Sequence, residues 1–304
     1  MSLLVLSEQD VERLLTMDEC IEAMADVLSS LARGDLFQPL RFVVRPPDAG
    51  GLMGFMPAHR GGADGAFSLK EIVVVPDNPS RGLDAHQGAV LLHDGETGEL
   101  RALLNASPIT AIRTAAVSAV ATRALARPGS RVVAILGTGV QGKAHAAAMR
   151  AVLDEPEIHL WSRASGGSAE EIVRSADVVC TCTTSREPVL ELDWLRPGAH
   201  VNAVGSSVPT SRELDEATVR AATLVVDRRE SALTESGELL LASLGEEQIA
   251  AELGEVLTGV HPGRTRDDEL TVFKSLGLGV EDLAAAELVV RRAREQGAGV
   301  EVEF

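Results

Sequence analysis

The sequence predicts an α/β protein of two domains, and three observations predict it. The chain has 304 residues, whereas a single domain usually has about 100–200. From residue 131 onward, short apolar runs alternate with polar or helical stretches, as strands and helices alternate around a parallel sheet. The first hundred residues instead show two helical patterns and then β-rich runs separated by turns. We therefore expect an α+β domain followed by an α/β domain.

The first domain is predicted to begin with two helices and to continue as a sheet. Ser7 and then Asp18 precede apolar residues at helical spacing, and Gly34 is a stop signal. Residues 40–104 contain β-rich runs such as RFVVR and AFSLKEIVVV, separated by turn sequences such as DNPSRG and DGETG. We expect an antiparallel sheet packed on the two helices.

A breaker-free helix is predicted over residues 109–126, ITAIRTAAVSAVATRALA, before Arg127-Pro128-Gly129 ends it. The Pro-Gly pair is the predicted boundary between a first domain of residues 1–128 and a second domain of residues 129–274. The tail, residues 275–304, contains a predicted helix from about 280 to 295 and a short strand. We expect this tail to pack back on the first domain.

Five buried strands are predicted in the second domain, namely RVVAIL, EIHLWS, DVVCTCT, HVNAVG and TLVVD. Gly137, Gly139 and Gly142 form the pattern G-x-G-x-x-G directly after the first of these strands and at the start of a helix. Such glycines permit a tight turn, approach to a pyrophosphate and close packing of helix on strand, while the helix N-terminus attracts the phosphates. The motif, with Val140 and Gln141 inside it, predicts a dinucleotide-binding domain of the Rossmann type.

The identity of the dinucleotide is predicted from the end of the second strand, about 20 residues past the glycines, where such folds read the ribose. Ser162 and Arg163 stand there in place of an acidic residue. An Asp or Glu would bind the hydroxyls of NAD(H), whereas an arginine suits a 2′-phosphate. NADP(H) is therefore the preferred cofactor and NAD(H) remains possible; the alternative for Arg163 is a solvated surface arginine.

The α/β domain is also predicted to be shortened after Arg163. The run WSRASGGSAEEIVRSADVV leads directly to the next strand, where the fold ordinarily interposes a helix and a further strand. About twenty residues are missing by comparison with an ordinary βαβ unit. Either the sheet is reduced on the adenine side of the cofactor, or the sequence omits a segment of the natural chain.

Composition excludes several classes of function. The formal net charge of −17 argues against a nucleic-acid partner, and the sequence contains no apolar stretch of about 18 residues that could cross a membrane. Acidic residues follow the N-terminus too soon for a signal peptide, so we expect a cytoplasmic protein. Cys20, Cys180 and Cys182 are expected to be reduced structural thiols, and no metal site is predicted.

Several segments of the chain together resemble the ornithine cyclodeaminase/mu-crystallin family. They are Met56-Pro57, Lys70, GLDAHQGAVLLHD, ITAIRTAAVSAVAT, GTGVQGKAH, DVVCTCTTSREPVL, LRPGAHVNAVGSSVPTSRELD, LGEVLTG and TVFKSLG. The resemblance implies a homodimer in which the first domain forms the dimer interface and binds the substrate, a small amino or imino acid. It also implies hydride transfer that forms or consumes the imine of an α-amino acid.

The resemblance assigns three cationic residues to the substrate, Arg41, Lys70 and Arg113. The chemistry agrees, because an arginine can hold an α-carboxylate through two hydrogen bonds. Lys70 beside two guanidinium groups should have a lowered pKa and handle a proton at the substrate nitrogen near neutral pH. His86 matches a position near substrate and cofactor, although a structural histidine is an equal alternative. Glu235 is expected at the edge of the substrate site.

The resemblance also assigns cofactor residues outside the glycine motif. Thr114 is expected to contact the phosphates, and Lys274 and Ser275 the nicotinamide ribose. Three residues at strand ends are expected on the nicotinamide side: Thr183, Thr184 and Val204.

One departure from the family separates the possible activities. Where ornithine cyclodeaminases carry an aspartate in a GGD-type turn, this chain reads Gly205-Ser206-Ser207. This turn, with VPTSRELD after it and VDRRESALTESGE further on, resembles the mu-crystallin and ketimine-reductase branch of the family. The resemblance therefore implies an NAD(P)H-dependent reductase of imino acids, such as pyrroline- or piperideine-2-carboxylate. The alternatives are an ornithine cyclodeaminase or an alanine-type dehydrogenase, and a non-catalytic NADP-dependent protein that binds a small ligand.

Overall fold

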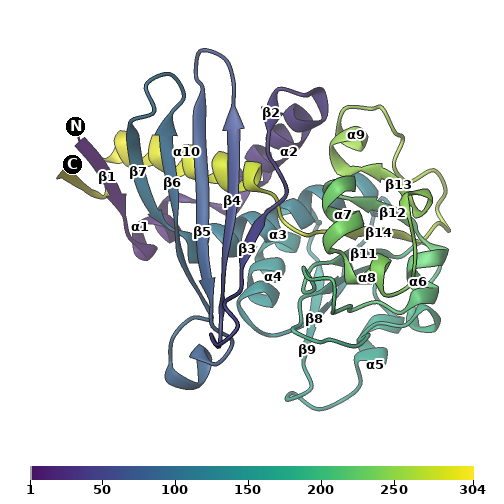
Figure 1. Ribbon diagram of the computed structural model, residues 1–304. Helices are drawn as coiled ribbons and strands as arrows, with labels where there is room; N and C mark the ends of the chain where they lie inside the picture. The colour runs from purple at the N-terminus through teal and green to yellow at the C-terminus, as the bar shows by residue number, and fades with distance from the viewer. Residues whose placement is uncertain (1) are drawn as a thin grey trace. The chain divides into compact units, whose positions relative to one another are not determined.

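The computed structural model describes residues 2–304, and the chain forms two compact units (Figure 1). Unit 1 comprises Met1–Arg113 and Leu278–Phe304, and unit 2 comprises Thr114–Gly277. The units divide inside helix α3 (Ala106–Leu125), and not at the Pro-Gly pair that follows this helix. A continuous Ala-rich helix has no breaker at its middle, so the sequence offers no sign of a boundary there.

Unit 1 contains an eight-stranded sheet. The strands run in the order β15-β1-β7-β6-β5-β4-β2, with β3 paired to β4. Strands β4 to β7 form an antiparallel meander, as the β-rich runs of the sequence predict, and β1 joins β7 in parallel. The strands are β1 (Ser2–Leu6), β2 (Leu36–Phe37), β3 (Phe42–Val44), β4 (Leu52–Arg60), β5 (Ala66–Val74), β6 (His86–Asp94), β7 (Leu100–Asn105) and β15 (Val300–Glu303).

Unit 1 also contains the helices α1 (Glu8–Leu14), α2 (Met17–Arg33) and α10 (Gly279–Gln296). Ser7 caps α1 in a capping box with Asp10, as predicted. The N-cap of α2 is Thr16, so the start expected at Asp18 was wrong by two residues; Asp18 lies in the first turn, where a carboxylate favours the helix dipole. Gly34 ends α2 with a φ of 84°.

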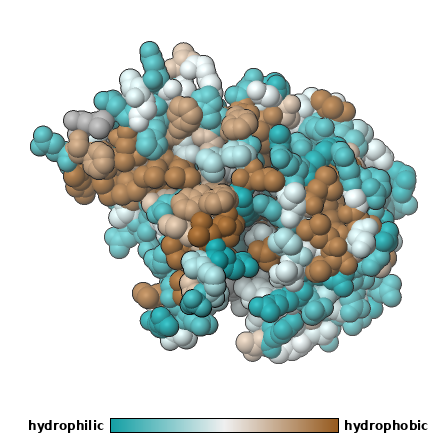
Figure 2. All heavy atoms as spheres, in the orientation of Figure 1, coloured by the Kyte–Doolittle hydropathy of each residue, from teal (hydrophilic) through white to brown (hydrophobic). Residues whose placement is uncertain are grey.

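The two faces of the sheet in unit 1 differ. Helix α10 packs on β4, β5 and β6, and on this face lie buried residues such as Met56, Lys70 and Val90. The opposite face carries hydrophobic residues that remain partly exposed, among them Phe67 at 46% and Val73 at 37%. In Figure 1 the strands lie in front of α10, and Figure 2 shows hydrophobic residues gathered over these strands. The tail thus returns to the sheet of unit 1, where β15 pairs with β1.

Unit 2 contains a seven-stranded sheet in which every pair of neighbouring strands is parallel, in the order β13-β12-β14-β11-β10-β8-β9. Its strands are β8 (Val132–Leu136), β9 (Glu157–Trp161), β10 (Val178–Thr181), β11 (His200–Ala203), β12 (Thr223–Val226), β13 (Ile249–Glu252) and β14 (Thr271–Lys274). Its shorter helices are α4 (Val140–Val152), α5 (Ala169–Arg174), α6 (Glu216–Ala221), α7 (Arg229–Glu235), α8 (Gly237–Leu240) and α9 (Leu253–Leu257). The predicted α/β fold class is therefore confirmed.

The sequence missed two strands of unit 2. Strand β14 lies between β11 and β12 in the middle of the sheet and is wholly buried, and β13 lies at one edge. Four-residue apolar runs of this kind resemble buried helix segments, so periodicity does not distinguish them.

Strand β9 forms the other edge of this sheet, next to β8. Helix α5 connects β9 directly to β10, so no further strand lies between them in the chain. The connection from β9 to β10 therefore consists of one short helix and its flanking loops. Hydrophobic residues from β8, β10, β11, β12 and β14 form the core beneath the strand ends that carry the predicted cofactor residues.

Within residues 2–304, no helix is both long enough and apolar enough to cross a membrane.

Candidate active site

The glycine-rich turn between β8 and α4 has the close contacts that a dinucleotide-binding turn requires. Gly137 has a φ of 127°, and a Cβ atom there would lie 2.4 Å from the carbonyl oxygen of Cys182. A Cβ atom on Gly142 would lie 2.0 Å from the carbonyl oxygen of Gly137, so helix and turn touch. Gly139, the N-cap of α4, has open space around it, and Val140 is 65% exposed. This end of α4 can therefore receive phosphates at its N–H groups.

The loop after β9 brings two predicted cofactor residues to the surface. The backbone N–H of Ser162 donates to Ser165 Oγ at 3.0 Å and closes a turn. The exposed guanidinium of Arg163 donates to Ser185 Oγ in the loop after β10, at 3.2 Å. An exposed arginine held by one neutral partner can bind a phosphate group.

The carboxyl ends of β10, β11 and β14 carry the other predicted residues of unit 2. Thr183 follows β10, and its N–H and hydroxyl both donate to the carboxylate of Glu213, at 2.6 and 2.7 Å. Thr184 beside it is exposed, whereas Val204 and Ser275 are buried. Thr114 is buried on α3, and Glu235 is half-buried at the end of α7.

Lys274 points into the protein interior. Its ammonium group is 1% exposed, lies 3.2 Å from Glu238 Oε2 and donates to the carbonyl oxygen of Ser206 at 2.5 Å. It thus fixes the turn after β11 through protein contacts. Because the sequence shows only the residue type, it could not reveal that this lysine is enclosed.

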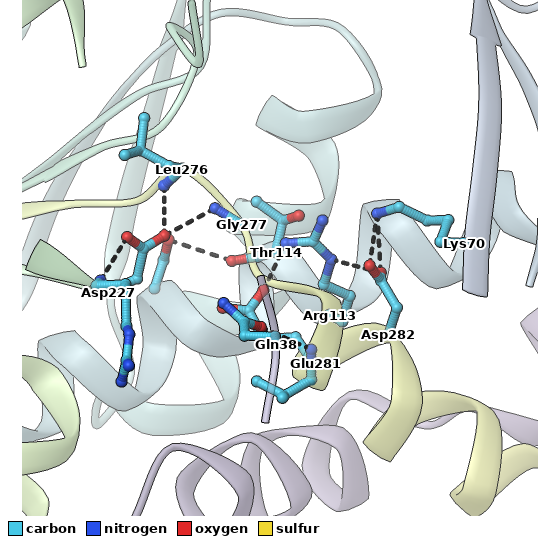
Figure 3. A network of polar contacts seen from close by, with 12 residues as sticks. Gln38, Lys70, Arg113, Thr114, Asp227, Leu276, Gly277, Glu281 and Asp282 are labelled. Atoms are coloured by element: carbon cyan, nitrogen blue, oxygen red, sulfur yellow. Dashed lines mark hydrogen bonds and ion pairs between the residues drawn. The ribbon is translucent and has the colours of Figure 1, made fainter. Parts of the chain in front are cut away.

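Asp227 is a functional candidate that the sequence reading did not single out. It follows β12, is buried, and accepts hydrogen bonds from the N–H groups of Leu276 and Gly277, at 2.6 and 2.8 Å (Figure 3). These contacts hold the last residues of unit 2 before the chain enters α10.

In unit 1, Lys70 and Arg113 share one carboxylate. Lys70 Nζ lies 2.8 Å from Asp282 Oδ2, and Arg113 Nε donates to Asp282 Oδ1 at 3.1 Å. Arg113 Nη1 also donates to Glu281 at 2.5 Å. Figure 3 shows Lys70 reaching from β5 toward Asp282, with Arg113 on the other side of that carboxylate. All four side chains are at most 5% exposed.

The electrostatics of this cluster change the acidity of Lys70. Burial, followed by the charge of Arg113, lowers the pKa of Lys70 and the Asp282 carboxylate opposes both, so that the pKa is about 8. The carboxylates of Asp282 and Glu281 outweigh burial at Arg113 and raise its pKa. A lysine with a pKa of about 8 can gain and lose a proton near neutral pH, which is the property expected of it.

Arg41 and His86 lie close enough to Lys70 for their charges to interact: Arg41 affects the pKa of Lys70, and Lys70 affects the pKa of His86. The charge of Arg41, half-exposed just before β3, contributes to the lowered pKa of Lys70. His86 is the first residue of β6. Desolvation by the surrounding protein and the charge of the Lys70 ammonium lower the pKa of its imidazole. Two arginines and a lysine, Arg41, Arg113 and Lys70, thus lie near enough to one another in unit 1 for their charges to interact.

The sequence reading missed Glu281 and Asp282. The available signal was a pair of acidic residues in the otherwise apolar stretch LGVEDLAAAELVV, since carboxylates are rarely buried unless paired. Their partners lie 168 to 212 residues away in the chain, so the pairing itself could not be read.

The structure places the predicted residues in two separate sets. Arg41, Lys70, His86 and Arg113 all belong to unit 1, whereas every predicted cofactor residue and Glu235 belong to unit 2. Among residues 2–304, no group of three His, Cys, Asp or Glu side chains is arranged to hold a metal ion.

Comparison with known proteins gives consistent matches over the whole chain. The model of the ornithine cyclodeaminase/mu-crystallin family matches residues 1–167 and 163–297. The two matches meet in the loop after β9, where the chain is short. The ketimine reductase mu-crystallin of Mus musculus is 41% identical over 285 residues, which cover 88% of this chain and 89% of the relative.

Two solved structures superpose closely on this chain. One is the Δ1-pyrroline-2-carboxylate reductase of Thermococcus litoralis in complex with NADH and L-proline; it has a TM-score of 0.93 and 35% identity, covering 98% of this chain and 100% of the other. The second is an archaeal alanine dehydrogenase dimer with bound NAD; it has a TM-score of 0.94 and 32% identity, and both chains are covered completely.

Proposed function

Because this chain belongs to the ornithine cyclodeaminase/mu-crystallin family, we propose that it is an NAD(P)H-dependent reductase of imino acids. One observation carries the proposal: Lys70 is buried between Asp282 and Arg113 with a pKa of about 8. The reductases among the similar proteins act on imines of this kind, as the names ketimine reductase and Δ1-pyrroline-2-carboxylate reductase state.

The substrate carboxylate is bound by Arg41 and Arg113. The Nε and Nη1 atoms of Arg113 already contact Asp282 and Glu281, so the substrate meets the Nη2 side of the guanidinium. A guanidinium group can hold a carboxylate through two hydrogen bonds. This arrangement selects α-imino acids over uncharged imines.

Lys70 supplies the proton. When bound, a nicotinamide cofactor would supply the hydride for the imine carbon. Lys70 Nζ donates its proton to the imine nitrogen. The short contact with Asp282 holds the ammonium group in one place. Since the protonated lysine is the acid, the rate of reduction should fall as the pH rises through about 8.

The residues that would hold the dinucleotide fit it by geometry. The open backbone at Gly139 and the exposed start of α4 suit the pyrophosphate. Arg163, with Ser162, is proposed to bind the 2′-phosphate of NADP(H), which makes NADP(H) the preferred cofactor and NAD(H) the alternative. Arg163→Ala should weaken NADPH binding about tenfold and change NADH binding little. Equal effects on the two cofactors would refute this role.

The experiment that tests the function follows oxidation of NADPH and NADH by their absorbance. Δ1-pyrroline-2-carboxylate, Δ1-piperideine-2-carboxylate, and pyruvate with ammonia are offered in parallel. Oxidation with either cyclic imine is the expected result. Oxidation with pyruvate and ammonia alone would indicate an alanine-type dehydrogenase, and release of ammonia from ornithine with NAD an ornithine cyclodeaminase.

Lys70→Ala separates catalysis from ligand binding. We expect turnover to fall about 100-fold or more while NADPH affinity is retained, because the cofactor residues lie in unit 2. Unchanged turnover would refute the acid role of Lys70. A protein that binds NADPH but turns over none of the substrates before mutation would be a ligand-binding protein instead.

A homodimer is proposed through the partly exposed hydrophobic face of the sheet in unit 1. Pro57, Leu69, Leu91 and Leu103 form a row across β4 to β7 on this face. The archaeal alanine dehydrogenase that superposes on the chain is a dimer. Light scattering after gel filtration should give the mass of two chains, and Leu69→Asp should give that of one. A wild-type monomer would refute the proposal.

A further inference from the structure

Glu213 is a fully buried acidic residue to which the proposed function gives no role. Its backbone is held tightly: the N–H groups of Val189 and Leu190 donate to its carbonyl oxygen, at 2.8 and 3.1 Å. Its own N–H donates to Glu238 Oε1 at 3.1 Å. The side chain therefore starts from a fixed point and is directed at the carboxyl ends of β10 and β11.

The carboxylate of Glu213 accepts four hydrogen bonds from these strand ends. Oε1 accepts from the N–H and the hydroxyl of Thr183, at 2.6 and 2.7 Å. Oε2 accepts from the hydroxyl of Thr181 at 2.7 Å and from the N–H of Gly205 at 2.6 Å. Burial raises the pKa of Glu213, but four donors and the nearby charge of Lys274 favour the ionised form. A carboxylate is the one side chain that accepts at all four positions.

This carboxylate joins two loops at very close range. A Cβ atom on Gly205 would lie 2.2 Å from the carbonyl oxygen of Thr183 and 2.6 Å from Glu213 Oε1. On the other side of the same turn, Lys274 donates to Ser206 and pairs with Glu238. The turns after β10 and β11 are thus held by buried charges on both sides. In open α/β sheets the ligand binds outside the carboxyl ends of such strands.

We propose that Glu213 is a positioning residue for the nicotinamide half of the cofactor, because it sets the backbone of Thr183 and Gly205. It does so from below the strand ends, through hydrogen bonds to both turns. The proposal rests on the assignment of the dinucleotide to unit 2 in the proposed function. It predicts that Glu213 affects binding of the nicotinamide half and leaves the adenosine half, near Arg163 and the start of α4, unaffected.

The test compares binding of two ligands to the full chain. NADPH binding is followed by its fluorescence, and binding of 2′-phospho-ADP-ribose, which lacks the nicotinamide ring, by competition. In Glu213→Gln the amide NH₂ faces donors where the carboxylate accepted, so hydrogen bonds to Thr183 or Gly205 are lost. We expect NADPH to bind about 10- to 100-fold more weakly and 2′-phospho-ADP-ribose to bind as before. Glu216→Gln, an exposed residue paired with Arg220 on α6, is the matched control and should change neither.

The outcomes are distinct. Unchanged NADPH affinity in Glu213→Gln, or equal loss of both ligands, overturns the proposal, since the second result indicates a general structural role. If Glu213→Gln does not fold, Thr181→Val is measured instead, because it removes one of the four donors. Several-fold weaker binding of NADPH, with unchanged binding of 2′-phospho-ADP-ribose, supports the proposal. Unchanged binding of NADPH overturns it. A wild-type protein that binds NADPH but reduces no imine refutes the proposed function and leaves this inference to be judged by the binding data. A wild-type protein that binds no dinucleotide refutes both.

Discussion

Lys70 depends for its chemistry on one buried neighbour, Asp282, which also contacts Arg113. The carboxylate raises the pKa of Lys70, while burial and the charge of Arg113 lower it. The pKa of about 8 is the balance of these opposing effects. Changing the neighbour should therefore move the pKa without removing the lysine.

The first prediction concerns Asp282→Asn. Removing the negative charge should lower the pKa of Lys70 below about 8, because the ammonium loses the partner that stabilises it. The chain contains only three lysines, Lys70, Lys143 and Lys274, so NMR of protein labelled in the lysine side chains can follow each one through a pH titration. The alkaline fall in the rate of imine reduction should move to lower pH by the same amount.

Glu281→Gln is the control for this prediction. Glu281 pairs with Arg113, whereas Lys70 pairs with Asp282. Glu281→Gln should therefore shift the pKa of Lys70 less than Asp282→Asn does. Equal shifts in the two variants would show that Asp282 has no special role, and a Lys70 pKa that stays near 8 in Asp282→Asn would contradict the assignment.

At the scale of elements, the turn between β8 and α4 combines a packing requirement and a binding requirement. Gly142 allows α4 to touch the turn, whereas Gly139 leaves its backbone open. Gly142 therefore serves packing and Gly139 serves phosphate binding within one motif. Substituting each glycine in turn distinguishes the two roles.

The second prediction compares Gly142→Ala with Gly139→Ala. In Gly142→Ala the new methyl group would lie 2.0 Å from a carbonyl oxygen, so α4 must shift and both thermal stability and NADPH binding should fall. In Gly139→Ala nothing lies within 4 Å of the methyl group, so stability should be unchanged while NADPH binding falls. Thermal unfolding and NADPH fluorescence measure the two effects. Normal NADPH binding by Gly139→Ala would argue against a pyrophosphate at this turn.

At the scale of the whole molecule, a chain of buried polar contacts connects distant parts of unit 2. His145 on α4 contacts Ser118 Oγ on α3 at 2.9 Å, and His200 on β11 contacts Thr271 Oγ1 on β14 at 3.0 Å. Burial lowers the pKa of His145 to about 4 and that of His200 to about 3. Both imidazoles are therefore neutral in the folded protein at pH 5, where an unfolded chain would have them protonated.

The third prediction follows from this difference. Since both folded pKa values lie below the unfolded value of about 6.5, the unfolded state binds more protons and the free energy of unfolding decreases as the pH falls from about 6.5 toward 4. Each pKa unit corresponds to about 1.4 kcal/mol, so each histidine contributes on the order of 3 kcal/mol. Urea unfolding at pH 7.5, 6, 5 and 4 measures the loss. His145→Gln should flatten the curve, and a stability that is constant over this range would contradict the prediction.

Local patterns in the sequence predict the features that depend on neighbouring residues. The glycine motif, the caps at Ser7 and Gly34 and five strands of the parallel sheet were predicted from local pattern, because turns and buried strands impose local requirements on residue type. The short connection after Arg163 was predicted in the same way, by counting residues. The cationic substrate residues came from resemblance to a family.

The pairing of buried charges depends on contacts that form when the chain folds. Lys70 and Asp282 are separated by 212 residues, and Glu213 lies 30 residues from Thr183, so no local pattern pairs them. The same is true of the short strand β14, which is stabilised by β11 and β12 on either side and not by its own sequence. A buried charge is stable only beside its partner, and one sequence contains the residue types but not the contacts that chain folding creates between them.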